Sequence, residues 1–569
     1  MSQRFCGFPS SIHVPGRRRS QKSAKHPAHS RQGSQPKVNE ELLASKYATL
    51  FVAAMTAANL PAGAVGADYS VLTYHAHENR SGNFVVPKLT WDRAQTIHLD
   101  EGFQTHVSGK IYAQPLYWHP PGTQIAILLV ATEDNMVYAL DAASGREIWS
   151  RSLGTSIPRS ALECGDIDPL GTTGTPVIDE STQTVYLEAG IYDASGPHRR
   201  VFALALKDGS PLAGWPVDIA DALKGRDPTF NPKYQNERGA LTILSGTLYV
   251  PFGGHYGDCG QYNGWVVGIS LRDPKTTKSW STRARGGGVW APAGISSDGT
   301  SLFIATGNTI GAATWSGGEA VIRLAGDLHD PAAAKDFFAP ANWHDLDEED
   351  ADLGGTAPIP LDVATKSGPQ ALVLALGKDG RAYLLDRSDL GGIGGSLTVE
   401  MVSNDPIRTA PAAYPATDGV FVAFQGRGID CPPTRSTRAQ SSVIRFLQNI
   451  KWHRVGRLVG KWLKTEEDEL TALKIRPGSP PTVATSWCGR LRGAGSPIVT
   501  TTNGHSDPVV WIVGAEGDNQ LHGFKGDTGD PLFNGSADIM HGLHHFQSLI
   551  ASEDRLYVSA DGQVYAFVF

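Results

Sequence analysis

The chain has 569 residues, of which 40% are hydrophobic and 19% charged, and its formal net charge at pH 7 is -7. This balance lacks the basic excess of a nucleic-acid-binding protein, so a small molecule or another protein is the expected partner. The 64 glycines and 36 prolines supply the many turns of an all-β chain, and residues 68–430 show no long helical periodicity.

The first 67 residues have the features of a targeting segment. Lys46 precedes an apolar stretch over 47–60, and small residues at 62–67 offer cleavage positions. This order is typical of a secretory signal peptide, here at about 46–67, and the stretch is too short for a stable membrane span. Residues 1–45, with Arg17-Arg18-Arg19, reflect either a wrongly chosen upstream start codon or a twin-arginine or organellar signal. We therefore expect a periplasmic or secreted protein.

A short phrase recurs about once every 40 to 65 residues along the rest of the chain. It consists of an apolar strand followed by an aromatic residue, Ala, Leu and an Asp-like residue. Its clearest copy is VYALDAASGREIW at 137–149, and its last copy is VYAF at 564–567. Repeats of this strand-turn-strand kind are typical of β-propellers.

Eight segments have the character of the inner strand that opens a propeller blade, and most carry a proline near their start, where a strand tolerates it. These openers are 113–118, 174–178, 239–244, 291–296, 356–361, 409–414, 495–500 and 546–551. The eighth unit ends at Phe569 after only three strands. The sequence therefore predicts an all-β, eight-bladed propeller of four-stranded antiparallel blades over 68–569, which a strand from residues 69–107 completes and closes.

Residues 434–468 interrupt the pattern inside the sixth blade. From Arg435 to Lys464 the chain has eight basic residues and no acidic one, with apolar residues at roughly helical spacing. A basic amphipathic segment of this kind is typical of contact with a membrane surface or an acidic partner. A disordered or aberrantly translated insertion explains the same pattern.

Cysteine usage supports export. Loss of Cys6 with the signal would leave Cys164, Cys259, Cys431 and Cys488, an even number that suits an oxidising compartment. Four cysteines allow three pairings, and we favour Cys164 with Cys259 and Cys431 with Cys488. Each of these pairs would join neighbouring blades or two loops of one blade, whereas the alternative is four buried thiols.

Several stretches resemble the quinoprotein alcohol dehydrogenase-like superfamily, which is built of pyrroloquinoline-quinone (PQQ) propeller repeats. GGGVW at 286–290 with LFIATGN at 302–308 is similar to the stretch in which that family keeps a Trp beneath the quinone and an Asn on Ca²⁺. DADLGG at 350–355 precedes an inner strand, where the family keeps its catalytic Asp, and 377–387 resembles its Lys/Arg turn. The resemblance covers roughly 69–569 apart from the insert.

The resemblance implies PQQ and Ca²⁺ as cofactors. Trp290 would be the quinone floor, Lys378 the cation that contacts the quinone, and Asn308, Asp352 and Asp258 the metal ligands. Asp352 would also be the catalytic base that takes the proton of a substrate hydroxyl. These residue types suit the chemistry, because a flat quinone with several carboxylates requires an aromatic floor, a cation and oxygen ligands for a hard metal ion.

The chain also departs from the family pattern. The family's vicinal Cys-Cys pair is missing, Asp258 beside Cys259 stands where the family has a Glu ligand, and no Cys-x-x-Cys-His haem motif occurs. The sequence thus predicts an exported PQQ- and Ca²⁺-dependent dehydrogenase of alcohols or sugars that passes electrons to an external acceptor. The alternative is a non-catalytic propeller scaffold that binds or assembles proteins of the cell envelope.

Overall fold

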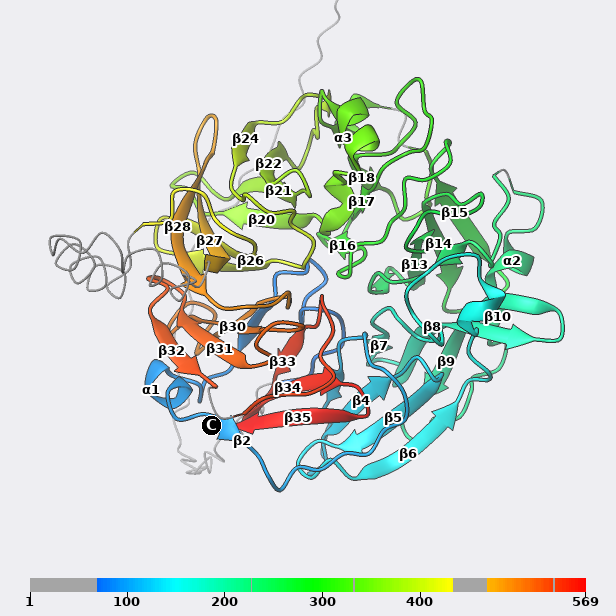
Figure 1. Ribbon diagram of the computed structural model, residues 1–569, viewed down its shortest axis with the longest axis horizontal. Helices are drawn as coiled ribbons and strands as arrows, with labels where there is room; N and C mark the ends of the chain where they lie inside the picture. Colours follow the sequence, from blue (N-terminus) through cyan, green and yellow to red (C-terminus); the bar gives the residue numbers. More distant parts are fainter. Residues whose placement is uncertain (1–68, 227, 331–332, 433–467, 536–537) are drawn as a thin grey trace, which may run out of the picture. The chain divides into compact units, whose positions relative to one another are not determined.

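The residues that the computed structural model describes, 69–226, 228–330, 333–432, 468–535 and 538–569, form eight β-sheets. The sheets follow one another along the chain and around a ring, and each is one blade of a propeller (Figure 1). The predicted eight-bladed, all-β architecture is therefore confirmed. Three short helices, α1 (Trp91–Ala94), α2 (Ile219–Ala222) and α3 (Trp343–Glu349), lie in the connections of this described part.

Blades one to four are built as follows. The first contains β3 (Leu116–Trp118), β4 (Ile127–Ala131), β5 (Met136–Asp141) and β6 (Glu147–Ser152). The second contains β7 (Val177–Asp179), β8 (Thr184–Asp193), β9 (Gly196–Ala205) and β10 (Val217–Asp218). The third contains β12 (Thr242–Leu244), β13 (Thr247–Gly254), β14 (Trp265–Ser270) and β15 (Thr277–Ser281), with β11 (Gln235–Asn236) on β13. The fourth contains β16 (Ser296–Ser297), β17 (Leu302–Thr306), β18 (Ala320–Leu324) and β19 (Phe337–Ala339), with β23 (Gly392–Ile393) beside β19.

Blades five to eight complete the ring. The fifth contains β20 (Ile359–Val363), β21 (Gln370–Leu376), β22 (Arg381–Asp386) and β24 (Thr398–Met401). The sixth contains β25 (Ala412–Ala416), β26 (Gly419–Gln425), β27 (Asp468–Arg476) and β28 (Thr482–Arg490). The seventh contains β29 (Ile498–Thr501), β30 (Val509–Val513), β31 (Leu521–Lys525) and β32 (Pro531–Asn534), with β1 (Asn83–Val85) parallel to β29. The eighth contains β33 (Leu549–Ala551), β34 (Arg555–Ala560), β35 (Gln563–Val568) and β2 (His98–Leu99).

An N-terminal strand closes the ring, as the sequence predicted. β2 pairs antiparallel with β35, with His98 opposite Val568 and Leu99 opposite Phe567. Figure 1 shows β2, in blue, beside β35, in red. This pairing gives the last blade its fourth strand and joins the two ends of the propeller, so that no open edge is left there.

The repeat phrase is apolar on both sides because each blade packs between two others. In β5, Val137 and Ala139 face a cluster shared with the second blade, whereas Tyr138 and Leu140 face one shared with the eighth blade. Alternate residues of a strand point to opposite faces of its sheet, so both faces of β5 are buried. The VYAL phrase therefore supplies apolar contact to both neighbours at once.

The Trp and Gly of the phrase join successive blades. Trp149 donates its indole N–H to the carbonyl of Leu206 at 2.9 Å, in the next blade. A Cβ atom at Gly209 would lie 2.6 Å from the Trp149 ring, so only glycine fits beneath it. Trp487 and Gly529 repeat this arrangement, with the same 2.6 Å approach.

Residues 71–82 run along the inner strands of the blades. Arg80 is fully buried, and Tyr74 is buried in a cluster with Ala240, Ala291 and other alanines that precede the inner strands. Backbone hydrogen bonds tie the segment to five blades: Tyr117 to Val71, Ile178 to Leu72, Ser297 to Glu78, Ala413 to Ser81 and Val499 to Gly82. The segment therefore lies in the central channel beside the inner strands, a position that its sequence did not indicate.

Both favoured disulfides are present. Cys164–Cys259 joins the connection between β6 and β7 to the loop between β13 and β14, with a Cα–Cα distance of 6.0 Å. Cys431–Cys488 joins the connection that follows β26 to β28, with a Cα–Cα distance of 5.6 Å. The predicted targeting segment (1–67) and all but the last residue of the predicted insert (434–468) lie outside the described residues. No helix among the described residues is long and apolar enough to cross a membrane.

Candidate functional site

The residues that precede each inner strand form one rim of the channel. The inner strands begin later than the sequence predicted: β29 begins at Ile498 rather than at 495, and β16 at Ser296 rather than at 291. The reason is that the preceding residues bond to neighbouring blades instead of to their own sheet. The N–H of Ala240 donates to the carbonyl of Pro292 at 3.0 Å, and that of Leu241 to the carbonyl of Thr175 at 3.1 Å. We call the residues that come directly before each inner strand the lead-ins; Arg238, Trp290 and Asp352 belong to those of the third, fourth and fifth blades.

Four of the predicted site residues lie together on this rim. The Lys378 ammonium lies 2.5 Å from Oδ2 of Asp352 and 5.2 Å from the centroid of the Trp290 ring. The backbone N–H of Asn308 donates to Oδ1 of Asp352 at 2.7 Å. Trp290 belongs to the lead-in of the fourth blade and Asp352 to that of the fifth, while Asn308 follows β17 and Lys378 follows β21. The structure thus places an aromatic face, a cation and a carboxylate side by side.

Glycine at position 307 makes this close approach feasible. A Cβ atom there would lie 2.7 Å from Oδ1 of Asp352 and 3.0 Å from Nε1 of Trp290. The N–H of Lys378 donates to the carbonyl of Asp352 at 2.9 Å, which fixes the two loops against each other. The Thr-Gly-Asn turn of the sequence therefore sets the spacing between the carboxylate and the indole.

Burial controls the charges in this group. Asp352 is 3% exposed, and burial raises the pKa of its carboxyl even though Lys378 and the Asn308 N–H stabilise the charged form. Burial opposes the charge of Lys378, but the neighbouring Asp352 raises the pKa of the ammonium above its ordinary value. Behind them, burial and the charge of Asp352 raise the pKa of Glu319 well above its ordinary value. Glu319 accepts from the N–H of Leu353 at 2.6 Å, and we treat it as the neutral member of the pair.

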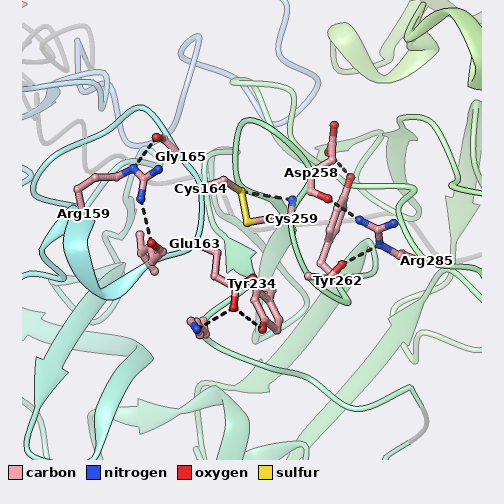
Figure 2. Close-up of a disulfide and its surroundings, with 12 residues drawn as sticks. Arg159, Glu163, Cys164, Gly165, Tyr234, Asp258, Cys259, Tyr262 and Arg285 are labelled. Atoms are coloured by element: carbon pink, nitrogen blue, oxygen red, sulfur yellow. Dashed lines mark hydrogen bonds and ion pairs between the residues drawn. A yellow bond between two sulfur atoms is a disulfide. The ribbon is translucent and has the colours of Figure 1, made fainter.

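Asp258 is held in a separate network, next to the first disulfide (Figure 2). The Tyr262 hydroxyl donates to its Oδ1 at 2.5 Å, and Arg285 donates to its backbone carbonyl at 2.5 Å and to that of Gly260 at 2.7 Å. The N–H of Cys259 lies 3.2 Å from Sγ of Cys164. Burial raises the pKa of Tyr262, and the charges of Asp258 and Asp352 add to that shift, so the two carboxylates act on the same phenol.

The two implied cofactors fit these residues differently. Trp290 and Lys378 suit the face and the negative groups of a flat, carboxylated quinone. For Ca²⁺ the ligands are less complete, because within the described ranges no three His, Cys, Asp or Glu side chains gather as ligands. Both oxygens of Asp352 and one of Asp258 already accept hydrogen bonds, so a cation would have to displace Lys378.

A second group of buried charges was not foreseen from the sequence. Arg199 donates from Nε and Nη2 to the two oxygens of Glu188 at 2.7 and 2.6 Å, and both side chains are fully buried. Glu133 accepts from the N–H of Gly171 at 2.6 Å, and Glu237 from that of Gly174 at 3.1 Å. Burial raises the pKa of Glu133 and of Glu188 to about 7. The only signal was a charged residue inside an apolar strand, as at Glu188 in β8.

A polar depression of about 510 Å³ lies away from this rim. Its lining includes Asp298, Asp362 and Arg387, beside the far ends of β16 and β20, and Glu78 of the N-terminal segment. Arg387 donates to Asp362 at 2.5 Å. The lining of this depression includes none of the residues that the sequence predicted for the site.

No family model matches the chain, and no curated protein matches it. Among solved structures, quinohemoprotein alcohol dehydrogenase from Comamonas testosteroni is 15% identical with a TM-score of 0.59, over 88% of this chain and 80% of that one. The quinohemoprotein alcohol dehydrogenase ADHIIG from Pseudomonas putida HK5 is 13% identical, with the same TM-score and coverage. A europium-containing methanol dehydrogenase is 12% identical with a TM-score of 0.55, over 88% of this chain and 98% of that one. At such identities the likeness concerns the fold: the chain shares its eight-bladed propeller fold with these alcohol and methanol dehydrogenases.

Proposed function

We propose that the protein is an exported oxidoreductase whose rim site binds a flat quinone such as PQQ and oxidises an alcohol or a sugar. The observation that carries the proposal is the proximity of the Lys378 ammonium to both the Trp290 ring and the buried Asp352 carboxylate. Two disulfides support export, because such cross-links persist in oxidising compartments. The periplasm and the extracellular space are both consistent with them.

Each residue has a defined role in this proposal. The quinone, when bound, would supply the acceptor for the two electrons of the alcohol. Trp290 would stack on the ring, and Lys378 would donate to its negatively charged oxygens. Asp352 would accept the hydroxyl proton, a task for which burial and a raised pKa suit a carboxylate. A neutral Glu319 behind it would keep a second negative charge away from the base.

Calcium binding stays a separate prediction. Asn308, Asp352 and Asp258 are its proposed ligands, and binding would require Lys378 to leave Asp352. We therefore treat quinone binding and calcium binding as independent arms of the same experiment.

A non-catalytic scaffold is the second candidate. The ion pair between Asp352 and Lys378 favours it, because both groups are satisfied without a ligand. In that case the rim would recognise a protein of the cell envelope rather than a substrate.

The test is a titration of the purified protein with PQQ, with and without Ca²⁺, followed by Trp fluorescence. We expect saturable quenching that K378Q weakens and dye-linked alcohol oxidation that D352N abolishes, while D352N still binds the quinone. The matched control is K525Q, because Lys525 lies over the Trp91 ring at 4.5 Å, away from the rim. An absence of saturable quenching in both buffers would leave the scaffold as the better candidate.

A further inference from the structure

Arg238 brings an unbalanced positive charge to the rim. It lies in the lead-in of the third blade and is half-buried. In the described part of the chain, no hydrogen bond or ion pair joins its side chain to another residue. Its guanidinium carbon instead lies 4.7 Å from the centroid of the Phe546 ring, in the eighth blade. Burial lowers the pKa of Arg238, but a guanidinium stays charged at neutral pH.

Two other buried arginines of this protein have protein acceptors, although Nη1 of Arg199 is left without one among the described residues. Arg80 donates to Thr73, Tyr74, Leu241, Thr242 and Ile295, and Arg199 forms a two-pronged pair with Glu188. A guanidinium has five donors in a fixed planar fork, and no acceptor in the described chain meets those of Arg238. The donors of Arg238 are therefore open to the acceptors of a ligand as well as to water.

The surroundings hold Arg238 in place for such a contact. Phe546 has a φ of 69°, a conformation that bulky residues rarely adopt, and its N–H donates to the carbonyl of Ala494 at 2.8 Å. Tyr112, whose pKa responds to the charge of Arg238, stacks on His544 at 4.4 Å. The rim around the guanidinium is therefore aromatic, and one of its aromatic side chains is kept in place by a strained backbone.

The nearest acidic groups do not neutralise Arg238. Glu133 and Asp166 are close enough to affect its pKa, yet neither forms an ion pair with it. Glu133 is directed to the N–H of Gly171, and Glu237, the preceding residue, to that of Gly174. The negative charges of Glu133 and Asp166 also disfavour an anion that is held only by charge attraction. We therefore expect a ligand that accepts two hydrogen bonds from the planar guanidinium through two oxygens.

The subsite adjoins the candidate quinone site. A Cβ atom at Gly239 would lie 3.0 Å from the carbonyl oxygen of Ala291, the residue that follows Trp290. The lead-ins that carry Arg238 and Trp290 are therefore neighbours on the same rim.

We propose that Arg238, with Phe546 and Tyr112, is a subsite for the carboxylate of a ring-shaped small molecule, and that the substrate of the rim site is an acid. The identification of this molecule as a substrate rests on the proposed oxidoreductase function, whereas binding of the carboxylate does not. Arg238 would be a binding residue that contacts the substrate and takes no part in proton transfer.

The test compares benzoate with benzamide, which have the same shape and differ in charge, by titration calorimetry on the purified protein. We expect benzoate to bind at least about tenfold more tightly, because a two-pronged carboxylate contact contributes more than about 1.4 kcal/mol. R238Q should bind both compounds equally. R146Q, which removes an exposed arginine of the first blade, should keep the preference. If R238Q does not fold, R238K serves instead and should lose most of the preference while keeping the charge.

Two results would overturn the proposal: equal affinities in the unmodified protein, or an unchanged preference in R238Q and R238K. Repeating the titration with saturating PQQ separates the two possible sources of the carboxylate. A preference that persists supports an acidic substrate, and one that disappears assigns Arg238 to the quinone and overturns the substrate inference. If PQQ does not bind at all, the oxidoreductase proposal fails while the preference for benzoate still identifies an anion site.

Discussion

Replacement of Arg80 by methionine tests whether the N-terminal segment holds the blades together. Arg80 is 1% exposed and joins the segment to the third and fourth blades. Its Nε donates to the carbonyl of Ile295 at 3.0 Å, and its Nη2 donates to the carbonyl of Leu241 at 2.9 Å and to the Thr242 hydroxyl. Its Nη1 donates to Thr73 and Tyr74 within the segment itself. Methionine fills a similar volume without any donor.

The expected loss is about 4 kcal/mol in the free energy of unfolding. A hydrogen bond to a charged group contributes about 1.5 to 3 kcal/mol, and the contributions of several bonds to one side chain do not add fully. The carbonyl of Leu241 would in addition stay buried without this donor, whereas that of Ile295 would keep the Thr242 hydroxyl. R80K keeps the charge but cannot reach every acceptor, so it should lie between R80M and the unmodified protein.

The measurement is urea unfolding followed by both Trp fluorescence and circular dichroism. R93M is the control, because Arg93 is exposed and, among the described residues, its side chain donates only to the carbonyl of Phe569 at 3.4 Å. Its loss should therefore change stability by less than about 0.5 kcal/mol. A loss below about 1 kcal/mol for R80M would show that the segment lies in the channel without bracing the ring. Equal losses for R80M and R93M would refute the reasoning.

Three further changes test other parts of the structure. E133Q should stabilise the protein at pH 8 by up to roughly 3 kcal/mol and leave its stability unchanged at pH 4. Burial raises the pKa of Glu133 in the folded protein to about 7. The contribution of Glu133 to stability is therefore fully present below its usual pKa and is lost as the pH rises toward 7, because the carboxylate then has to be buried in its charged form. A flat difference between the two melting curves across this range would contradict that shift. G307A should weaken quinone quenching with little change in the melting temperature, because the added methyl displaces Asp352 or Trp290; unchanged quenching would separate these residues from the ligand. C431S should lower the free energy of unfolding by about 2 to 4 kcal/mol, because it removes the Cys431–Cys488 disulfide. Thermal melting of the unmodified protein and of C431S checks this, and under reducing conditions the two proteins should melt alike.

The number of blades could be predicted because the repeat reflects a packing requirement. Each middle strand is buried against two neighbours, so a phrase such as VYAL at 137–140 has apolar residues on both faces, and its Trp and Gly join one blade to the next. Closure by β2 was predictable as well, since a blade that ends at Phe569 lacks a fourth strand.

Other features have no local signal in the sequence. The start of each inner strand depends on bonds between neighbouring lead-ins, which the sequence of one blade does not reveal. The segment around Tyr74 and Arg80 shows no periodicity, because its contacts come from six different blades rather than from a sheet of its own. Arg238 was likewise missed, since its importance lies in the absence of an acceptor rather than in a motif.

The contrast between Arg80 and Arg238 bears on where this protein acts. Folding stability alone favours the pattern at Arg80, where a buried guanidinium has an acceptor for each of its donors. Along the rim the pattern differs: Arg238 has no acceptor in the described chain, Phe546 is strained, and burial raises the pKa of Asp352 beside Lys378. The N-terminal segment also carries strain, since Arg80 itself has a φ of 61° and both ring nitrogens of His75 are buried without a hydrogen-bond partner among the described residues. What distinguishes the rim is a guanidinium without an acceptor in the described chain on the same rim as the ion pair of Asp352 and Lys378, so we expect the candidate site at the lead-ins, whether the ligand is a quinone, an acid or an envelope protein.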